Sequence, residues 1–183
     1  MLRHRLKGFT LIELVVVITI IAILAAVALP RFIALQRDAR VAKLNAAKGS
    51  VAAASALVHS AYLTRGGTAD TTGCAGGATV ADNTSTICTE HGLVAITNGY
   101  PSVVATASLG SGNPGIIGAA GLTSTFNPTA AQLAAEGYTV TGAGTVQTVA
   151  ISSAPTPANC SFTYTQAAAN AAATVSAVTT TGC

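Results

Sequence analysis

One long apolar run near the N-terminus limits what this chain can fold into. From Phe9 to Leu29 the only charged side chain is Glu13. As an α-helix rising about 1.5 Å per residue, this run would be roughly 30 Å long, which matches the hydrocarbon core of a bilayer. A carboxylate inside such a span costs about 2.5 to 3.5 kcal/mol on insertion scales. The run therefore predicts one membrane-spanning helix in which Glu13 has a specific role.

A cleavable secretory signal is the alternative interpretation of this run. The segment AILAAVALP, which ends at Pro30, does offer the small residues that a signal peptidase needs. The run is longer than the apolar region of a typical signal, however, and a carboxylate would be unfavourable in a segment that is discarded. We therefore expect the helix to remain part of the protein.

Four cysteines indicate on which side of the membrane the rest of the chain lies. Cys74, Cys88, Cys160 and Cys183 form no CxxC pair and lack the spacing of a zinc site, so we expect structural disulfides and no metal. Disulfides persist in oxidising compartments, which places the part after residue 70 outside the cytoplasm. The basic residues around the span slightly favour the opposite orientation, and the need to oxidise the cysteines overrules them.

Three pairings of these cysteines are possible. Closure entropy favours Cys74 with Cys88 and Cys160 with Cys183, because these pairs close the shortest loops. The second bridge would also tie together the predicted C-terminal strands. Each bridge is expected to contribute about 2 to 4 kcal/mol to the stability of a domain with few aromatic residues.

The charge distribution argues against nucleic acid as a partner. The net charge of +3 lies entirely in the first eight residues, where Arg3, Arg5 and Lys7 face no acid. The remainder has equal numbers of basic and acidic side chains, so no basic surface is expected there. With 8% charged and 4% aromatic residues, the composition also differs from that of a typical soluble enzyme.

After the apolar run, the pattern predicts an amphipathic helix that continues to about residue 65. Pro30 removes one backbone donor and is expected to bend the helix without ending it. A continuous helix of this length must bury its apolar face against something. The predicted apolar positions are Phe32, Leu35, Ala39, Ala42, Ala46, Val51, Ala54, Leu57, Val58 and Ala61.

The residues from 66 onward predict a small antiparallel sheet that lies on the amphipathic helix. Gly66 and Gly67 end the helix, and a loop is expected from Thr68 to Ile87. An apolar run follows at residues 91–104 and is closed by the turn signal Asn98-Gly99. A capped two-turn helix is expected after Asn127-Pro128-Thr129, and four strands are expected at residues 138–141, 145–151, 161–166 and 173–181.

Titratable residues in the second part of the chain do not form a catalytic pattern. His59 and His91 have no acid and serine partners in a suitable arrangement and are expected to be solvated. Asp70, Asp82 and Glu90 fall in one loop region, but their spacing fits no calcium loop, so we expect surface acids. No cofactor and no enzymatic activity are expected.

The residues Gly8-Phe9-Thr10-Leu11-Ile12-Glu13 resemble the prepilin processing motif of type IV pilins and type II secretion pseudopilins. The similarity covers the short basic leader, Gly8, an aromatic residue at the new N-terminus, Glu13 and the apolar run to Pro30. It implies that a prepilin peptidase cuts between Gly8 and Phe9 on the cytoplasmic side and N-methylates Phe9. It also implies the α+β pilin fold, with a long N-terminal helix packed on a small antiparallel sheet.

The same resemblance implies assembly. Before assembly, the subunit would be a single-pass protein of the inner membrane with its C-terminal part in the periplasm. The pilus assembly machinery would then polymerise copies of it into an extracellular helical filament with the apolar helices at its core. Glu13 is expected to pair with the Phe9 amine of a neighbouring subunit, since an isolated carboxylate in that core would be unfavourable. The alternative for Glu13 is a carboxylate that reaches a lipid headgroup.

The finer resemblance is to type IVa pilins of the mannose-sensitive haemagglutinin branch. It rests on the helix from Pro30, on Asn98-Gly99-Tyr100-Pro101 and on the closing segment from Cys160 to Cys183. The expected parts are a leader (1–8), a transmembrane and filament-core helix (9–30), an amphipathic helix half (31–65) and a globular head (66–183). One alternative is a pseudopilin or minor pilin, which shares the N-terminal motif. An alternative from another class of protein is an exported enzyme or binding protein that uses the helix only as a membrane anchor.

Overall fold

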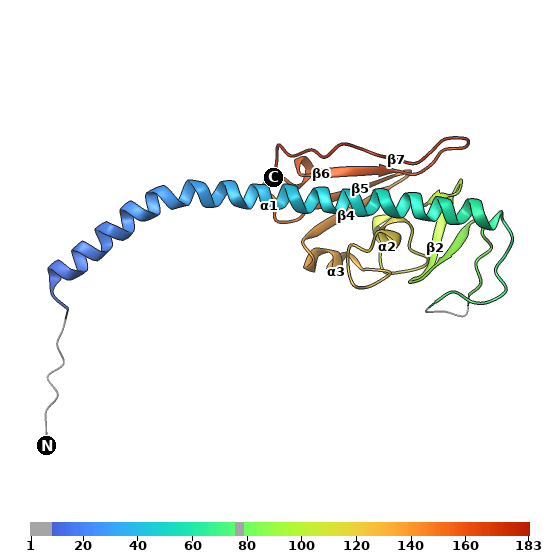
Figure 1. Ribbon diagram of the computed structural model, residues 1–183, viewed down its shortest axis with the longest axis horizontal. Coiled ribbons are helices and arrows are strands. Elements are labelled where there is room, and N and C mark those ends of the chain that lie inside the picture. The colour runs from blue at the N-terminus through green and yellow to red at the C-terminus, as the bar shows by residue number, and fades with distance from the viewer. Residues whose placement is uncertain (1–8, 76–78) are drawn as a thin grey trace, which may run out of the picture. The chain divides into compact units, whose positions relative to one another are not determined.

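The computed structural model describes residues 9–75 and 79–183 (Figure 1). The chain forms two compact units that meet between Ala39 and Arg40. Helix α1 (Leu11–Arg65) runs through both units and continues past Pro30 without interruption. The leader, 1–8, lies outside the described residues.

The second unit, from Arg40 onward, has an α+β architecture. It combines the C-terminal half of α1 with two antiparallel sheets, one of order β1-β2-β3 and one of order β4-β5-β6-β7. The predicted fold class is therefore confirmed. The remaining elements are β1 (Thr86–Thr89), β2 (Gly92–Thr97), β3 (Tyr100–Pro101), η1 (Thr106–Ser108), α2 (Ile116–Ala120), α3 (Ala130–Ala135), β4 (Tyr138–Ala143), β5 (Val146–Ile151), η2 (Pro157–Asn159), β6 (Ser161–Thr165) and β7 (Thr174–Val175).

The sheet β1-β2-β3 differs from the single sheet that was expected. β1 occupies the end of the predicted loop and pairs with β2 in the register Cys88↔Leu93. β2 turns back into β3 at Asn98-Gly99, both of which have positive φ (52° and 79°). This combination is typical of a two-residue hairpin. β1 was missed because Thr86–Thr89 is short and follows a polar loop, so pairing with β2 decides its conformation.

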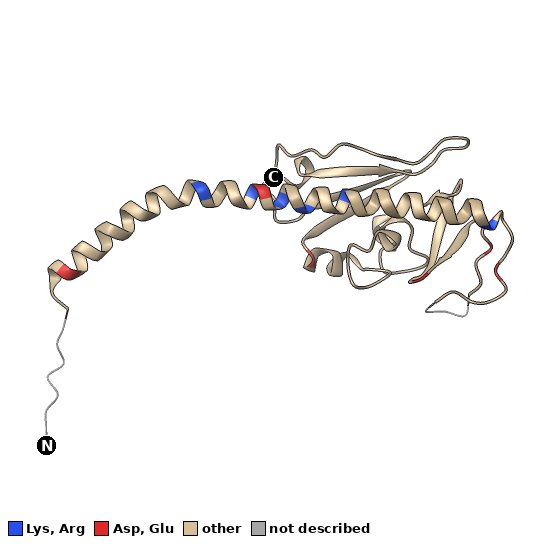
Figure 2. Cartoon of the chain, in the orientation of Figure 1, with Lys and Arg blue, Asp and Glu red and all other residues tan. Residues whose placement is uncertain are grey.

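The sheet β4-β5-β6-β7 corresponds to the four predicted C-terminal strands, with one difference. β7 is only two residues long, although a strand was predicted over residues 173–181. Beyond it the chain makes one further bridge, between Ser161 and Thr179. Thr-rich sequence favours extended backbone, but a regular ladder also needs a partner at every position. Figure 2 shows that the β4–β7 strands carry no charged residue.

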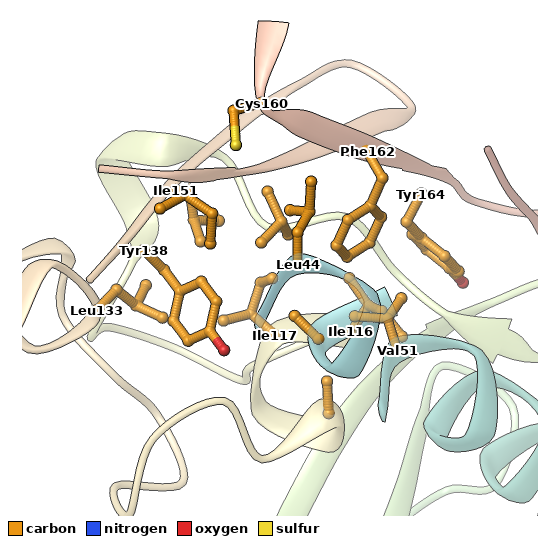
Figure 3. Packing of buried hydrophobic residues seen from close by; sticks show 14 of the residues in the cluster. Leu44, Val51, Ile116, Ile117, Leu133, Tyr138, Ile151, Cys160, Phe162 and Tyr164 are labelled. Carbon is orange, nitrogen blue, oxygen red and sulfur yellow. The ribbon is translucent and has the colours of Figure 1, made fainter. Parts of the chain in front are cut away.

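The main core lies between the second half of α1, α2 and the β4–β6 strands (Figure 3). Leu44 and Val51 of α1 are fully buried, and so are Phe162 and Tyr164 of β6. Burial raises the pKa of Tyr164 to about 12. Its hydroxyl therefore stays protonated and donates a hydrogen bond of 2.6 Å to the carbonyl oxygen of Pro101, which links the two sheets.

The buried stripe of α1 matches the predicted one at Val51, Ala54 and Val58 and differs from it elsewhere. Its hydrophobic members follow alternating spacings of three and four residues: Leu44, Ala47, Val51, Ala54 and Val58. Of the predicted positions, Ala42, Ala46 and Leu57 are exposed instead. Alanine occurs on every face of this helix, so its positions do not indicate which face is buried. The correct stripe is set by the larger side chains, which gain more free energy from burial.

Two disulfides close the second unit. Cys74–Cys88 joins the loop after α1 to β1, with the Cα atoms 5.3 Å apart. Cys160–Cys183 joins the start of β6 to the C-terminal residue, with the Cα atoms 4.8 Å apart, and both of its cysteines belong to the main core. Arg40 donates a hydrogen bond of 2.8 Å to the carbonyl oxygen of Cys183, which also fixes this end to α1.

The loop between α1 and β1 is ordered by polar side chains. Arg65, at the end of α1, pairs with Asp70 at 3.3 Å, and Asp70 accepts a hydrogen bond from the buried Asn83. Asp82 accepts hydrogen bonds from the backbone N–H groups of Thr84 (3.0 Å), Ser85 (2.9 Å) and Thr86 (2.8 Å). Among the described residues, no group of three or more potential ligands is placed to hold a metal ion.

Asp82 supplies a prediction about pH. Hydrogen bonds from the Ser85 hydroxyl and the loop N–H groups lower the pKa of the Asp82 carboxyl. The ionised carboxylate therefore contributes fully to the free energy of unfolding above the unfolded-state pKa of about 4. This contribution is lost progressively as the pH falls from there toward the lower pKa of the folded state. We expect Asp82→Asn to reduce the free energy of unfolding by about 1 kcal/mol at pH 7. Urea unfolding of the mature chain in detergent should show this difference narrowing below about pH 4. A difference that stays constant from neutral to strongly acidic pH would contradict the assignment.

Candidate assembly and processing site

The start of α1 is organised by a reciprocal pair of hydrogen bonds. Thr10 precedes the helix, and its hydroxyl oxygen accepts a hydrogen bond of 3.3 Å from the Glu13 N–H. Glu13 Oε2 accepts hydrogen bonds from the Thr10 N–H (2.9 Å) and the Thr10 hydroxyl (2.8 Å). This arrangement is a capping box, which satisfies N–H groups that the first helical turn leaves unpaired.

Thr10 is a functional residue that the sequence analysis missed. Thr-x-x-Glu just before an apolar run is the usual signature of a capping box, so the spacing of Thr10 and Glu13 could have revealed it. The box gives Glu13 a local structural role in addition to the pairing expected for it. Within the described residues only Oε2 is engaged, which leaves Oε1 able to accept from another donor.

The apolar side chains of this segment are exposed in the single chain. Phe9 is 92% exposed and Leu11 is 81% exposed. In the part of the chain that the structure describes, α1 is long and apolar enough to cross a membrane, and its most apolar window contains no buried residue. Large exposed apolar surfaces are unfavourable in water, so this segment requires lipid or protein around it.

Two features along the segment limit where polar contacts can form. Thr19 donates its hydroxyl to the Val16 carbonyl at 2.8 Å, so this polar group is satisfied within the helix. Pro30 lies inside α1, where it lacks the N–H that would otherwise bond to the preceding turn. Glu13, by contrast, is charged and keeps Oε1 as an acceptor without a partner among the described residues.

The structure separates the predicted site residues into distinct groups. Phe9, Glu13 and Pro30 all belong to the first unit, at or near the exposed apolar helix. Gly8 lies outside the described residues. The four cysteines belong to the second unit, where they form the two disulfides.

The two histidines differ in their surroundings. His91 is exposed and lies 3.7 Å from a carboxylate oxygen of Glu90. His59 is only half-exposed and stacks on the ring of Tyr100, so the expectation of a solvated side chain was wrong for this residue. The cause is tertiary: Tyr100 follows the β2–β3 turn, which packs on the end of α1.

Comparison with known proteins agrees with this arrangement. Residues 3–29 match the family described as the prokaryotic N-terminal methylation motif. Over 53 residues the chain is 51% identical to the type IV narrow pilus major component PilA5 of Thermus thermophilus. The aligned stretch is 29% of this chain and 46% of that protein, so the chain spans less than half of its relative's length. No solved structure is significantly similar to the chain.

The methylation motif lies at the start of the exposed apolar helix, and the second unit packs the same helix against antiparallel sheets. Both features, together with the similarity to PilA5 over 53 residues, support the prediction that the chain is a type IV pilin precursor.

Proposed function

We propose that this chain is the structural subunit of a type IV pilus. A prepilin peptidase removes residues 1–8, methylates the Phe9 amine and leaves a mature subunit anchored in the inner membrane by α1. The assembly machinery then transfers the subunit into an extracellular filament of identical copies. The observation that carries this proposal is the exposed apolar start of α1, which has the carboxylate of Glu13 in its first turn and lies within the match to the methylation motif.

The physical basis of assembly is the exchange of one apolar environment for another. In the membrane, lipid covers the exposed side chains of the first unit. In a filament, the equivalent helices of neighbouring copies cover them, while the disulfide-bonded second unit stays in water. Because both environments are apolar, the hydrophobic term changes little between them. Polar contacts and shape complementarity between subunits therefore have a large influence on the axial position that each subunit takes in the filament.

Glu13 is the group best suited to set the axial position of each subunit. The capping box holds its carboxylate at the first turn of α1, and Oε1 is free to accept from the methylated Phe9 amine of a neighbour. A carboxylate in an apolar core is strongly unfavourable without such a partner. Registers that leave Glu13 unpaired are therefore disfavoured, so the pairing selects one helical arrangement.

Processing can be tested directly by mass spectrometry of the protein recovered from surface filaments. We expect an N-terminus at Phe9 that is heavier than the unmodified residue by one methyl group. A Gly8→Val variant should keep its leader and stay in the membrane fraction, because a branched Cβ obstructs backbone entry into a protease site. Filaments that contain residues 1–8, or processing unaffected in Gly8→Val, would contradict the proposal.

Electron microscopy of the cells separates a major pilin from a minor pilin or pseudopilin. We expect deletion of the gene to remove the filaments and the purified filaments to consist mainly of this chain. Filaments that persist in the deletion strain would assign it to a minor or pseudopilin role instead.

A further inference from the structure

Two arginines follow the apolar run of α1 and have no role in the fold. Arg31 comes directly after Pro30, and Arg37 lies six residues further along the same helix. Both side chains are exposed, and both residues belong to the first unit. We call this pair the arginine collar.

The basic residues that come next along α1 differ from the arginine collar because they have partners within the chain. Arg40 donates a hydrogen bond to the Cys183 carbonyl oxygen. Lys43 donates to the Glu136 carbonyl oxygen, and its Nζ lies 4.6 Å from the centre of the Tyr138 ring. Among the described residues, the collar donates no such hydrogen bond. Each guanidinium carries five N–H donors, so the collar has capacity for a partner outside the chain.

The charge of the arginine collar is not neutralised locally. Asp38 follows Arg37 directly, but adjacent residues on a helix point in different directions and do not face each other. The positions three and four residues from Asp38, on either side, are all apolar. Within residues 9–75 and 79–183, no ion pair includes a member of the collar. The two positive charges are therefore available to an anion.

The position of the collar along α1 places it at the surface of a bilayer. Measured from Leu29, where the apolar run ends, Arg31 lies about 3 Å and Arg37 about 12 Å further along the helix axis. The headgroup layer on each side of a bilayer is about 5 to 7 Å thick. Helical side chains lean toward the N-terminus of their helix. With the second unit outside the cytoplasm, both arginines therefore reach back toward the headgroups.

The chemistry of the guanidinium selects the class of ligand. Its planar array of N–H groups binds phosphate oxygens in pairs, as two parallel charge-assisted hydrogen bonds. Phospholipid phosphates are the anions that a membrane-inserted α1 brings next to the collar. A phosphate whose headgroup also carries an amine has no net charge, so lipids with a net negative charge are preferred. We propose that the arginine collar binds the phosphates of anionic phospholipids at the periplasmic surface of the inner membrane.

Lipid binding gives a physical reason for an unusual charge distribution. Basic residues usually gather on the cytoplasmic side of a membrane span, whereas Arg31 and Arg37 follow the span on the other side. Phosphate contacts at that end fix the depth of the apolar run in the bilayer. Glu13 is then held near the opposite surface until assembly begins. This inference rests on the membrane-anchored stage of the proposed function.

The test is native mass spectrometry of the mature subunit in detergent micelles. The micelles contain equal amounts of phosphatidylglycerol, which is anionic, and phosphatidylethanolamine, which has no net charge, and the measurement counts the molecules of each lipid that the subunit retains. The variants are Arg31→Gln, Arg37→Gln and the double variant. Lys48→Gln is the matched control, because it also removes one positive charge from α1. Lys48 lies about 28 Å beyond Leu29, which is more than a Debye length from the headgroups.

We expect the wild type to retain phosphatidylglycerol in preference to phosphatidylethanolamine. Each single collar variant should lower this preference about fivefold, which is the effect of one basic side chain near an anionic surface. The double variant should retain both lipids equally, and the Lys48→Gln control should behave like the wild type. The proposal is overturned if the wild type shows no preference, if the double variant keeps it, or if the control loses it equally.

Filament counts by electron microscopy distinguish lipid binding from contact between subunits. If the double variant keeps the lipid preference but loses its filaments, the arginines contact an acidic group of a second copy and lipid binding is refuted. Lipid retention is measured on isolated subunits and does not require filaments. A wild type that forms filaments without a lipid preference would therefore refute the collar and leave the pilus function intact, whereas a preference without filaments would support the collar and refute the pilus function.

Discussion

Replacing Glu13 with Ala is expected to reduce surface filaments about tenfold or more, while the subunit is still processed and held in the membrane. In the proposed filament, the Phe9 amine of a neighbouring subunit would lose its counter-charge inside an apolar core. Removing one partner of a buried ion pair typically costs about 3 to 5 kcal/mol. The apolar span itself is retained, so membrane anchoring is unaffected.

A second substitution separates the two roles of Glu13. Glu13→Gln keeps a side chain that can complete the capping box with Thr10, but it carries no charge. If the charge pairing controls assembly, Glu13→Gln should lose filaments nearly as severely as Glu13→Ala. Wild-type filament numbers in Glu13→Gln would show that capping alone is sufficient and would refute the pairing with the amine.

The measurement is a count of filaments per cell by electron microscopy, together with the amount of mature pilin in membrane and sheared fractions. Glu90→Gln is the matched control, because Glu90 is an exposed acid of the second unit, far along the chain from the span. Filament numbers in this control should equal those of the wild type. A parallel loss in the control would point to a general defect in the subunit.

Removing the Cys160–Cys183 disulfide is expected to have the second large effect. We predict that Cys160→Ser combined with Cys183→Ser lowers the free energy of unfolding of the mature subunit by about 2 to 4 kcal/mol. The bridge closes a loop with a sequence separation of 23, and both cysteines lie in the main core beside β6. Its loss frees the C-terminal segment in the unfolded chain and leaves two polar hydroxyls in an apolar environment.

Urea unfolding of the mature protein in detergent measures this effect, and the amount of pilin in the membrane fraction reports it in cells. The matched control is Cys74→Ser with Cys88→Ser, which removes a bridge with a sequence separation of 14 outside the main core. We expect the control to lose less stability. The interpretation fails if the two double variants are equally stable or if the control is the weaker one.

Part of the fold could be predicted because it depends on neighbours in the sequence. The short helix α3 begins at a capping box between Thr129 and Gln132, and its signals lie within a few residues of one another. The β4–β5 hairpin follows from alternating residues around a glycine-rich turn. The prediction erred where the same local pattern allowed several outcomes, as in the Thr-rich segment that forms only a two-residue β7.

The candidate assembly site shows the same division. The span, its single carboxylate and the motif around Phe9 are contiguous, so they could be recognised without a structure. The contact between Thr10 and Glu13 is also local. The stack of His59 on Tyr100 could not be predicted, because it joins α1 to the β2–β3 hairpin, which only the packed chain brings together.

The amino-acid sequence by itself determined that α1 starts as an apolar, membrane-length helix behind a methylation motif, because hydrophobicity and processing signals act over short, continuous stretches. The tertiary structure decided which of the candidate apolar positions on α1 are buried, since Val51, Ala54 and Val58 were predicted but Leu44 and Ala47 were not. Alanine is spread around the helix, and Leu44 and Val51 point inward because the β4–β6 strands and α2 offer a surface that the large side chains can fill. Which side chains of α1 point into the core therefore depends on how well they pack against segments that are distant in the sequence.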